Sequence, residues 1–146
     1  MRVALYAEEG ARTPEYADNG CSGADVFAHL KEPLVLQPGE RALIPTGLKV
    51  EFPAGFELQV RPRSGLALKR GITVLNTPGT IDSSYRGEIG IILINHGTSS
   101  FTVDQGMKIA QLVMAPVERM TFLKVDQESM LSLTERGAGG FGHTGS

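Results

Sequence analysis

The residues best suited to do chemistry lie close together between positions 76 and 90. This stretch holds one carboxylate (Asp82), one aromatic ring (Tyr85) and one arginine within a few residues of each other. Turn-forming Asn, Pro, Gly and Ser residues separate a run that enters Asp82 from a second run that begins at Glu88, and this pattern predicts a β-hairpin. A hairpin can fold its backbone N–H and C=O groups around the edge of a flat ligand. An ordinary hairpin in which Asp82 caps its own turn fits the same residues.

A second stretch has the residue types that bind an anion. Residues 64–71 predict a short helix with Ser64 as its N-cap and Gly71 just after its end, and Arg63 precedes it. Unpaired N–H groups at a helix start and an arginine fork both favour phosphate. A capped helix with a surface arginine is the alternative interpretation of this stretch alone.

Short strands are expected to position these groups. Many short apolar runs, closely spaced turns and 18 glycines predict an all-β sandwich, jelly roll or barrel. The run 89–94 is almost entirely β-branched or Leu, so it is expected to be a buried central strand. The other expected strands cover residues 3–6, 34–36, 42–44, 48–50, 56–60, 109–114 and 122–125.

Composition limits the class of protein. A chain of 146 residues with 41% apolar and 21% charged residues favours a single domain. The net charge of −2, without a block of Lys or Arg, argues against an extended nucleic-acid surface. The single cysteine, Cys21, excludes an internal disulfide and a cysteine zinc cluster. Neither a signal peptide nor a membrane span is recognisable, so a cytoplasmic location is expected.

The last ten residues, 137–146, are half glycine. They match G-x-G-x-x-G and resemble a P-loop with His143 in place of lysine, but both motifs need a strand before them and a helix after them. Both folds are therefore rejected. A glycine-rich backbone can still wrap phosphates closely with its N–H groups. A solvent-exposed tail without a role is the alternative.

Taken together, five segments resemble, in order, the five motifs of the trimeric dUTPase family: 24–28, 63–67, 76–90, 106–112 and 136–145. The resemblance implies hydrolysis of dUTP to dUMP and pyrophosphate, which keeps uracil out of DNA. It implies an all-β jelly-roll or β-clip subunit with one short helix, covering residues 1–136, and a flexible glycine-rich arm, 137–146, that closes over the active site. It also implies a homotrimer whose active sites are shared between subunits, and Mg²⁺ on the triphosphate.

The resemblance also assigns roles by position. Asp82 matches the general base that activates water, and Tyr85 matches the ring that packs on deoxyribose. Asp25 matches the acid that acts on the metal through water. The uracil edge would be read by Asn76 and by the hairpin backbone at Gly79, Thr80, Ile81 and Gly90. Phosphate contacts match Arg63, Ser64, Gly65 and Gln111, and the arm contributes Arg136, Phe141, Gly142, His143 and Thr144.

Departures from the family pattern are few, and two rival functions use the same scaffold. Met107 stands where a charged or small residue is common, and His143 where serine is common. A dCTP deaminase of the sister group would carry a glutamate as its catalytic acid, where this chain has Asp82. A catalytically idle nucleotide-binding regulator is the second rival. Release of pyrophosphate from dUTP, but not from dCTP, dTTP or UTP, separates the three hypotheses.

Overall fold

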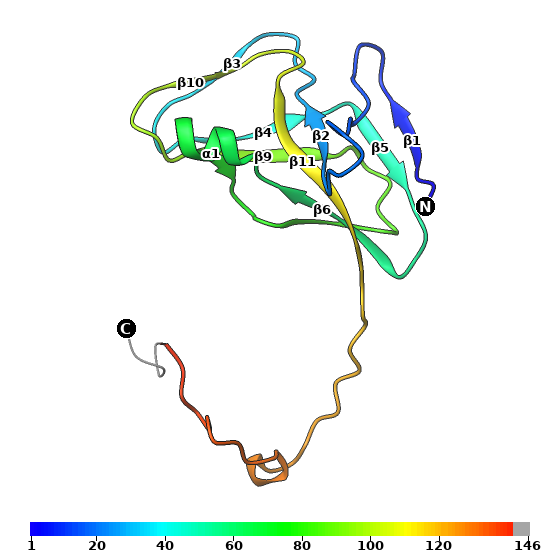
Figure 1. The fold of residues 1–146 in the computed structure, drawn as a ribbon, viewed down its shortest axis with the longest axis vertical. Coiled ribbons are helices and arrows are strands. Elements are labelled where there is room, and N and C mark those ends of the chain that lie inside the picture. Colours follow the sequence, from blue (N-terminus) through cyan, green and yellow to red (C-terminus); the bar gives the residue numbers. More distant parts are fainter. Residues whose placement is uncertain (142–146) are drawn as a thin grey trace.

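The computed structural model describes residues 1–141, which form a β-rich body with an extended C-terminal segment below it (Figure 1). The prediction of an all-β fold with one short α-helix is confirmed. The elements in chain order are β1 (Ala4–Ala7), β2 (Ala24–Phe27), β3 (Leu34–Leu36), β4 (Arg41–Pro45), β5 (Leu48–Glu51), β6 (Phe56–Arg61), α1 (Ser64–Arg70), β7 (Ile72–Val74), β8 (Gly79–Asp82), β9 (Gly90–Asn95), β10 (Phe101–Val103), β11 (Lys108–Pro116) and the 3₁₀ turn η1 (Glu128–Met130).

The strands pair antiparallel in four small sheets. The largest has the order β2-β11-β6-β8, and a second has the order β4-β9-β7. Two further pairs, β1-β5 and β10-β3, complete the body. Neighbours in these sheets are mostly far apart in the sequence, so the fold depends on long-range pairing.

Alternating side chains build the core between the sheets. On β6, Leu58 and Val60 point inward while the residues between them face outward, as a strand's period of two requires. The expected buried strand is confirmed: β9 lies between β4 and β7, and Ile91 and Leu93 are completely buried. Because one face of each of the two larger sheets is buried, the register of their strands is fixed.

Two buried polar residues tie the loops to the core. The Thr46 hydroxyl donates to the carbonyl oxygen of Ile89 at 2.6 Å, and the Glu88 carboxylate accepts from the backbone N–H groups of Thr46 and Gly47 at 3.2 and 2.8 Å. Asn95 donates to two carbonyl oxygens, those of Leu36 and Ser99, both at 2.9 Å. These bonds satisfy groups that would otherwise be buried without a partner.

The prediction of a hairpin over residues 76–90 is wrong. β8 pairs with β6, whereas β9 pairs with β4 and β7, so the two runs belong to different sheets. Ile81 and Ile91 both point into the core, and residues between β8 and β9 cross from one sheet to the other. Each run finds a partner that is distant in the sequence, and local turn signals cannot reveal such a partner.

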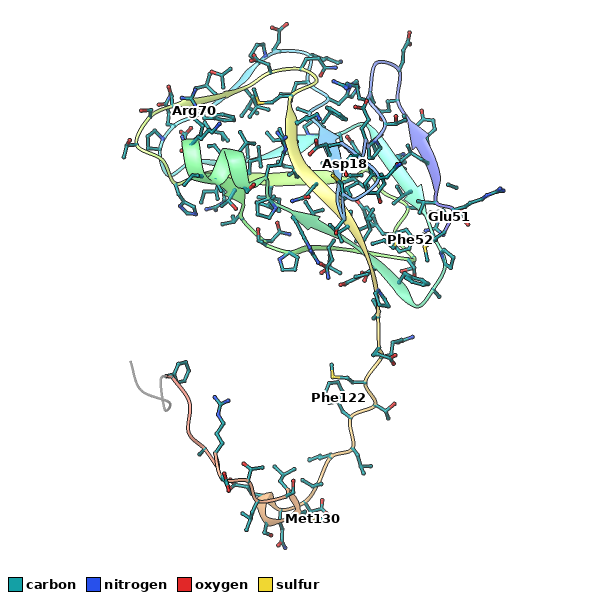
Figure 2. The ribbon with its side chains drawn as sticks, in the orientation of Figure 1. Asp18, Glu51, Phe52, Arg70, Phe122 and Met130 are labelled. Atoms are coloured by element: carbon teal, nitrogen blue, oxygen red, sulfur yellow. The ribbon has the colours of Figure 1, made fainter. Side chains whose placement is uncertain are left out.

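The predicted strand at residues 122–125 is also absent. After Pro116 the chain leaves the body, and Figure 2 shows Phe122 and Met130 on this extended segment, away from the sheets. Phe122 is 84% exposed and Leu123 is 89% exposed. A strand needs a neighbour to pair its backbone N–H and C=O groups, and within the described part of a single copy residues 122–125 make no backbone pairing.

The predicted helix is formed, with one correction at its start. Arg63, not Ser64, is the N-cap residue, and no side chain caps the first turn. Gly71 ends the helix with φ of 69°, the left-handed conformation that glycine adopts without strain. In residues 1–141, no helix has the length and apolar character needed to cross a membrane.

We predict that Asn95→Ala destabilises the fold by about 3 kcal/mol, because the carbonyl groups of Leu36 and Ser99 and the N–H of Gly97 lose their partner in the core. Urea unfolding at one fixed protein concentration measures the change. Asn19→Ala, at an exposed position, is the matched control and should stay within about 0.5 kcal/mol of the parent. Equal stability of the two variants would contradict a structural role for Asn95.

Candidate functional site

Five of the residues expected to contact phosphate or metal gather around one cavity of about 330 Å³. It lies where β2, the start of α1 and β11 meet. The predicted residues that line it are Asp25, Arg63, Ser64, Gly65 and Gln111, and the wall is completed by Ala17, Cys21, Ser22 and Gly23.

Strand register brings the acid and the amide of this cavity together. Asp25 on β2 lies opposite Gln111 on β11, which in turn lies opposite Arg61 on β6. Residues directly opposite each other in an antiparallel pair point to the same face of the sheet. The backbone of Asp25 is also held from the loop before it, because Asp25 and Glu15 exchange N–H···O bonds of 2.8 and 3.0 Å.

The Asp25 carboxylate is paired with two cations. Its Oδ1 accepts from Arg63 Nε at 3.1 Å, and its Oδ2 lies 2.8 Å from Lys108 Nζ. The acid is only 16% exposed, so both contacts are screened less than surface ion pairs. One carboxylate against two cations leaves the group with an excess positive charge, which suits a polyanionic ligand. Sequence reasoning missed Lys108, because the contact depends on the register of β2 and β11.

Gln111 is fixed by a backbone contact and by a close glycine. Its Nε2 donates to the carbonyl oxygen of Pro62 at 3.0 Å, which links β11 to the segment that carries Arg63. A Cβ on Gly23 would collide with Gln111 Oε1, so a larger residue at this position would require the amide to shift. No pattern along the chain indicates this packing requirement.

Ser64 and Gly65 are exposed at the mouth of the cavity. Because Arg63 occupies the N-cap position, the Ser64 hydroxyl makes no capping hydrogen bond and can face a ligand. Around Gly65 there is open space, so its backbone can be approached closely.

The predicted base and ring lie elsewhere on the same chain. Asp82 is the exposed last residue of β8, and its carbonyl oxygen accepts from the N–H of Tyr85 at 3.0 Å. The Tyr85 hydroxyl donates to the carbonyl oxygen of Glu88 at 2.9 Å. The ring lies over Gly87, where any Cβ would collide with it. These contacts hold the ring in one orientation beside the turn.

The other residues of this second group differ in exposure. Asn76 and Thr80 are exposed, whereas Gly79 and Ile81 are buried and Ile81 belongs to the core. Gly90 is partly covered by Leu43. Gly79, Ile81 and Gly90 all lie in paired strands, and the buried Ile81 side chain cannot contact a ligand.

Strand geometry separates the two groups widely within one chain. Asp25 and Asp82 lie on the outer strands of the sheet β2-β11-β6-β8, three strand spacings apart, or roughly 14 Å. Across the sheet, Asp25 lies in register with Arg61 on β6, and Asp82 lies in register with Glu57 on the same strand. Arg61 and Glu57 are four residues apart along β6, which adds about 13 Å. The two carboxylates therefore lie about 20 Å apart along the sheet. Within the described residues of one copy, the predicted base therefore does not reach the cavity lined by Asp25, Arg63 and Gln111.

The arm residues are described only in part. Arg136 donates from Nε to the carbonyl oxygen of Gly139 at 2.8 Å, so it closes a local turn. Phe141 is fully exposed. The remaining arm residues of the prediction, Gly142, His143 and Thr144, lie outside the described residues.

Comparisons with known proteins agree over nearly the whole chain. The family model described as dUTPase matches residues 10–145. The chain is 57% identical to a deoxyuridine 5'-triphosphate nucleotidohydrolase of Chlamydia caviae and 61% identical to one of Chlamydia pneumoniae, in each case over 145 residues and 99% of both proteins.

Solved structures give the same picture. A dUTPase of Staphylococcus bacteriophage 80alpha, solved with dUPNHPP, superimposes with a TM-score of 0.87 at 27% identity and covers 99% of both chains. A dUTPase mutant of phage phi11 of S. aureus, whose structure addresses the coordination of a structural Mg(II) ion, has a TM-score of 0.77 at 25% identity, covering 87% of this chain and 98% of that one. The prediction of a jelly-roll or β-clip subunit is confirmed.

We predict that Gly23→Ala displaces the Gln111 side chain and weakens its bond to Pro62, at a cost of about 1–3 kcal/mol in folding free energy. Urea unfolding measures the cost, and a crystal structure of the variant reports the position of Gln111. Gly65→Ala is the control for stability, since its Cβ meets open space in a helix that favours alanine. An unmoved Gln111 in a fully stable Gly23→Ala would contradict the packing described here.

Proposed function

Because the chain belongs to the dUTPase family and hydrolyses dUTP to dUMP and pyrophosphate, we propose that its active site is completed between copies of the chain. In this proposal Asp82 of one copy acts on a triphosphate that is bound in the cavity lined by Asp25, Arg63 and Gln111 of another. The observation that carries the proposal is the separation of about 20 Å between Asp25 and Asp82 in one chain.

The proposed reaction is an in-line displacement at the α-phosphorus. The Asp82 carboxylate accepts a proton from a water molecule, and the water oxygen bonds to the α-phosphorus. The bond from the α-phosphorus to the oxygen that bridges to the β-phosphate breaks, and pyrophosphate leaves with that oxygen. A general base must lie within hydrogen-bond reach of its water, and such proton transfer contributes about 10²–10⁴-fold. The exposed position of Asp82 at the end of a paired strand supports this role.

The phosphate cavity is proposed to neutralise the triphosphate before the water approaches it. Arg63 can donate to phosphate oxygens, and the Ser64 hydroxyl and Gly65 N–H add uncharged donors. The amide of Gln111 faces the same space. Fixed donors in a partly enclosed site stabilise developing negative charge without reorganisation, which is the largest catalytic contribution in many enzymes.

Mg²⁺ is the proposed cofactor, and the residues present fit a metal carried by the substrate. Within residues 1–141 no cluster of three or more His, Cys, Asp or Glu forms a cage for a metal ion. Both oxygens of Asp25 already contact cations, so Asp25 would act on the metal's water rather than on the metal itself. When bound to phosphate oxygens and water, Mg²⁺ supplies charge neutralisation at the triphosphate.

Selection of a uracil deoxynucleotide is proposed to rest on the second group of residues. Tyr85 offers a fixed ring against the sugar, which leaves no room for a 2′-hydroxyl. Asn76 and the backbone beside Thr80 offer hydrogen-bonding groups to the base. A site built to pair with polar base edges rejects a base that leaves those groups unpaired.

Uncovered apolar surface supports association of copies as a homotrimer. An apolar cavity of about 420 Å³ is lined by exposed Met1, Leu5 and Tyr16 and by core residues such as Leu58 and Leu112. The extended segment after β11 carries its own uncovered apolar side chains, which include Met120, Phe122 and Leu123. Burying such surfaces against a second copy would remove both from water.

The glycine-rich end of the chain is proposed to close over the bound nucleotide. Phe141 would cap the base, and Arg136, Gly142, His143 and Thr144 would contact the phosphates. The full exposure of Phe141 supports a partner other than its own chain. Closure of such a segment excludes water and completes the site. A cytoplasmic location is part of the same proposal, because dUTP is a free nucleotide.

We predict that Asp82→Asn keeps nucleotide affinity within about threefold but lowers kcat for dUTP by about 10²–10⁴-fold, because the amide cannot accept the proton from water. Pyrophosphate release measures kcat, and calorimetry with the dUTP analogue dUPNHPP measures affinity. Asp104→Asn, at an exposed position on another loop, is the matched control. An unchanged kcat in Asp82→Asn would remove Asp82 from its role.

We also predict that two inactive variants restore each other. If each site takes Asp82 from one copy and Arg63 from another, equal mixing of Asp82→Asn and Arg63→Ala chains makes about three quarters of the trimers hybrid, each with one intact site in three. Dissociating and reassembling the mixture should then recover about a quarter of parental activity. Recovery of no activity, in hybrids isolated by two different affinity tags, would show that one copy supplies both groups.

A further inference from the structure

The two oxygens of Asp25 are shared between two different cations. Arg63 Nε donates to Oδ1 at 3.1 Å, and Lys108 Nζ lies 2.8 Å from Oδ2. An arginine beside a carboxylate commonly forms two parallel N–H···O bonds, from Nε and Nη2 to the two oxygens. Here the second oxygen already contacts the lysine, and the arginine makes only one bond to the acid.

Lys108 is itself held in this position from several sides. It lies opposite Phe27 at a register shift between Lys108 and Ala110, and such irregularities redirect side chains. Its Nζ lies 5.8 Å from the centre of the Phe27 ring, while Arg12 stacks on the same ring at 3.7 Å. The Lys108 carbonyl oxygen also accepts from Arg63 Nη1 at 3.3 Å.

One nitrogen of the Arg63 guanidinium, Nη2, is left without a protein partner in residues 1–141. Its Nε contacts Asp25 and its Nη1 contacts the Lys108 carbonyl, whereas within residues 1–141 its Nη2 has no protein partner. Among the described residues, Asp25 is the one carboxylate in the lining of the cavity next to Arg63. Nη2 is therefore available to a phosphate oxygen.

We propose that Lys108 is a positioning residue that keeps Arg63 ready for phosphate. By holding Asp25 Oδ2, it competes with the two-bond fork that would consume Arg63 Nη2 and draws that oxygen away from the guanidinium. The inference rests on the proposed function, because it assumes that Arg63 binds the triphosphate. It assigns Lys108 a role exerted through Asp25 and Arg63, without contact to the nucleotide.

A general electrostatic role for Lys108 makes a different prediction. If Lys108 only attracts the triphosphate through its charge, replacing it should lower nucleotide affinity by the same factor whether or not Asp25 is charged. A residue that acts by occupying Asp25 Oδ2 loses its effect once position 25 cannot form the fork. Asp25→Asn provides that background, because its amide has a single acceptor oxygen. A double-mutant cycle between Lys108→Met and Asp25→Asn separates the two roles.

The test measures binding of dUPNHPP with Mg²⁺ by calorimetry, with KM and kcat for dUTP alongside. We expect Lys108→Met to weaken binding by about tenfold and to raise KM more than it lowers kcat, because a phosphate contact is lost in the ground state. In the Asp25→Asn background the same substitution should change affinity by less than about twofold. Lys108→Arg should restore binding, and Lys31→Met, at an exposed position, should match the parent.

A crystal structure of nucleotide-free Lys108→Met gives a readout independent of activity. We expect Asp25 Oδ2 to turn to Arg63 Nη2 and form the second hydrogen bond. If thermal unfolding shows that Lys108→Met does not fold, Lys108→Gln is measured in its place with the same expected outcomes.

Two results would overturn the inference. One is unchanged affinity in Lys108→Met, and the other is an equal loss in both backgrounds. Neither result bears on the proposed function, which depends on Asp82 and on an active site completed between two copies. By contrast, two results together would support both the proposed function and this inference: loss of activity in Asp82→Asn, and a Lys108→Met effect that disappears in the Asp25→Asn background.

Discussion

The antiparallel register of the sheet β2-β11-β6-β8 is the constraint on which the rest of the molecule depends. It sets Asp25 opposite Gln111 at one corner of a polar face and Asp82 opposite Glu57 at the far corner. A shift of one residue would turn either acid into the core, so the burial of Val26 fixes the position of Asp25 and the burial of Ile81 fixes that of Asp82. Chemistry at one triphosphate needs the base and the phosphate ligands within a few ångströms. A rigid sheet therefore favours a site that is assembled between copies.

The same constraint explains why the surface of a single copy is incomplete. Among residues 1–141, the cavity lined by Asp25, Arg63 and Gln111 is charged but does not include Asp82, and the Tyr85 ring is fixed beside a different turn. Apolar side chains such as Phe122 and Leu123 extend from the body without cover. Each of these features is costly or idle in isolation, and association of copies would use all of them. The charge balance around Asp25 prepares the cavity before any partner or nucleotide arrives.

Local pattern in the sequence was enough for most strands and for the family, but not for pairing. Alternation and β-branched runs located strands such as β9, and Gly71 marked the end of the helix. The hairpin prediction failed because β8 and β9 each pair with strands far away in the sequence. The strand predicted around Phe122 failed because propensity cannot supply a neighbour. Lys108 went unnoticed because its partner is set by register and a local bulge, which no spacing along the chain encodes.

A crystal structure of the protein with dUPNHPP and Mg²⁺ tests the central claim most directly. The measurement is which chains supply the Asp82 and Arg63 side chains that surround one bound nucleotide. Our account predicts that they come from different copies, with Asp82 one water away from the α-phosphorus. If one chain supplied both side chains to the same nucleotide, or if Asp82 lay far from the α-phosphorus, the account would be contradicted.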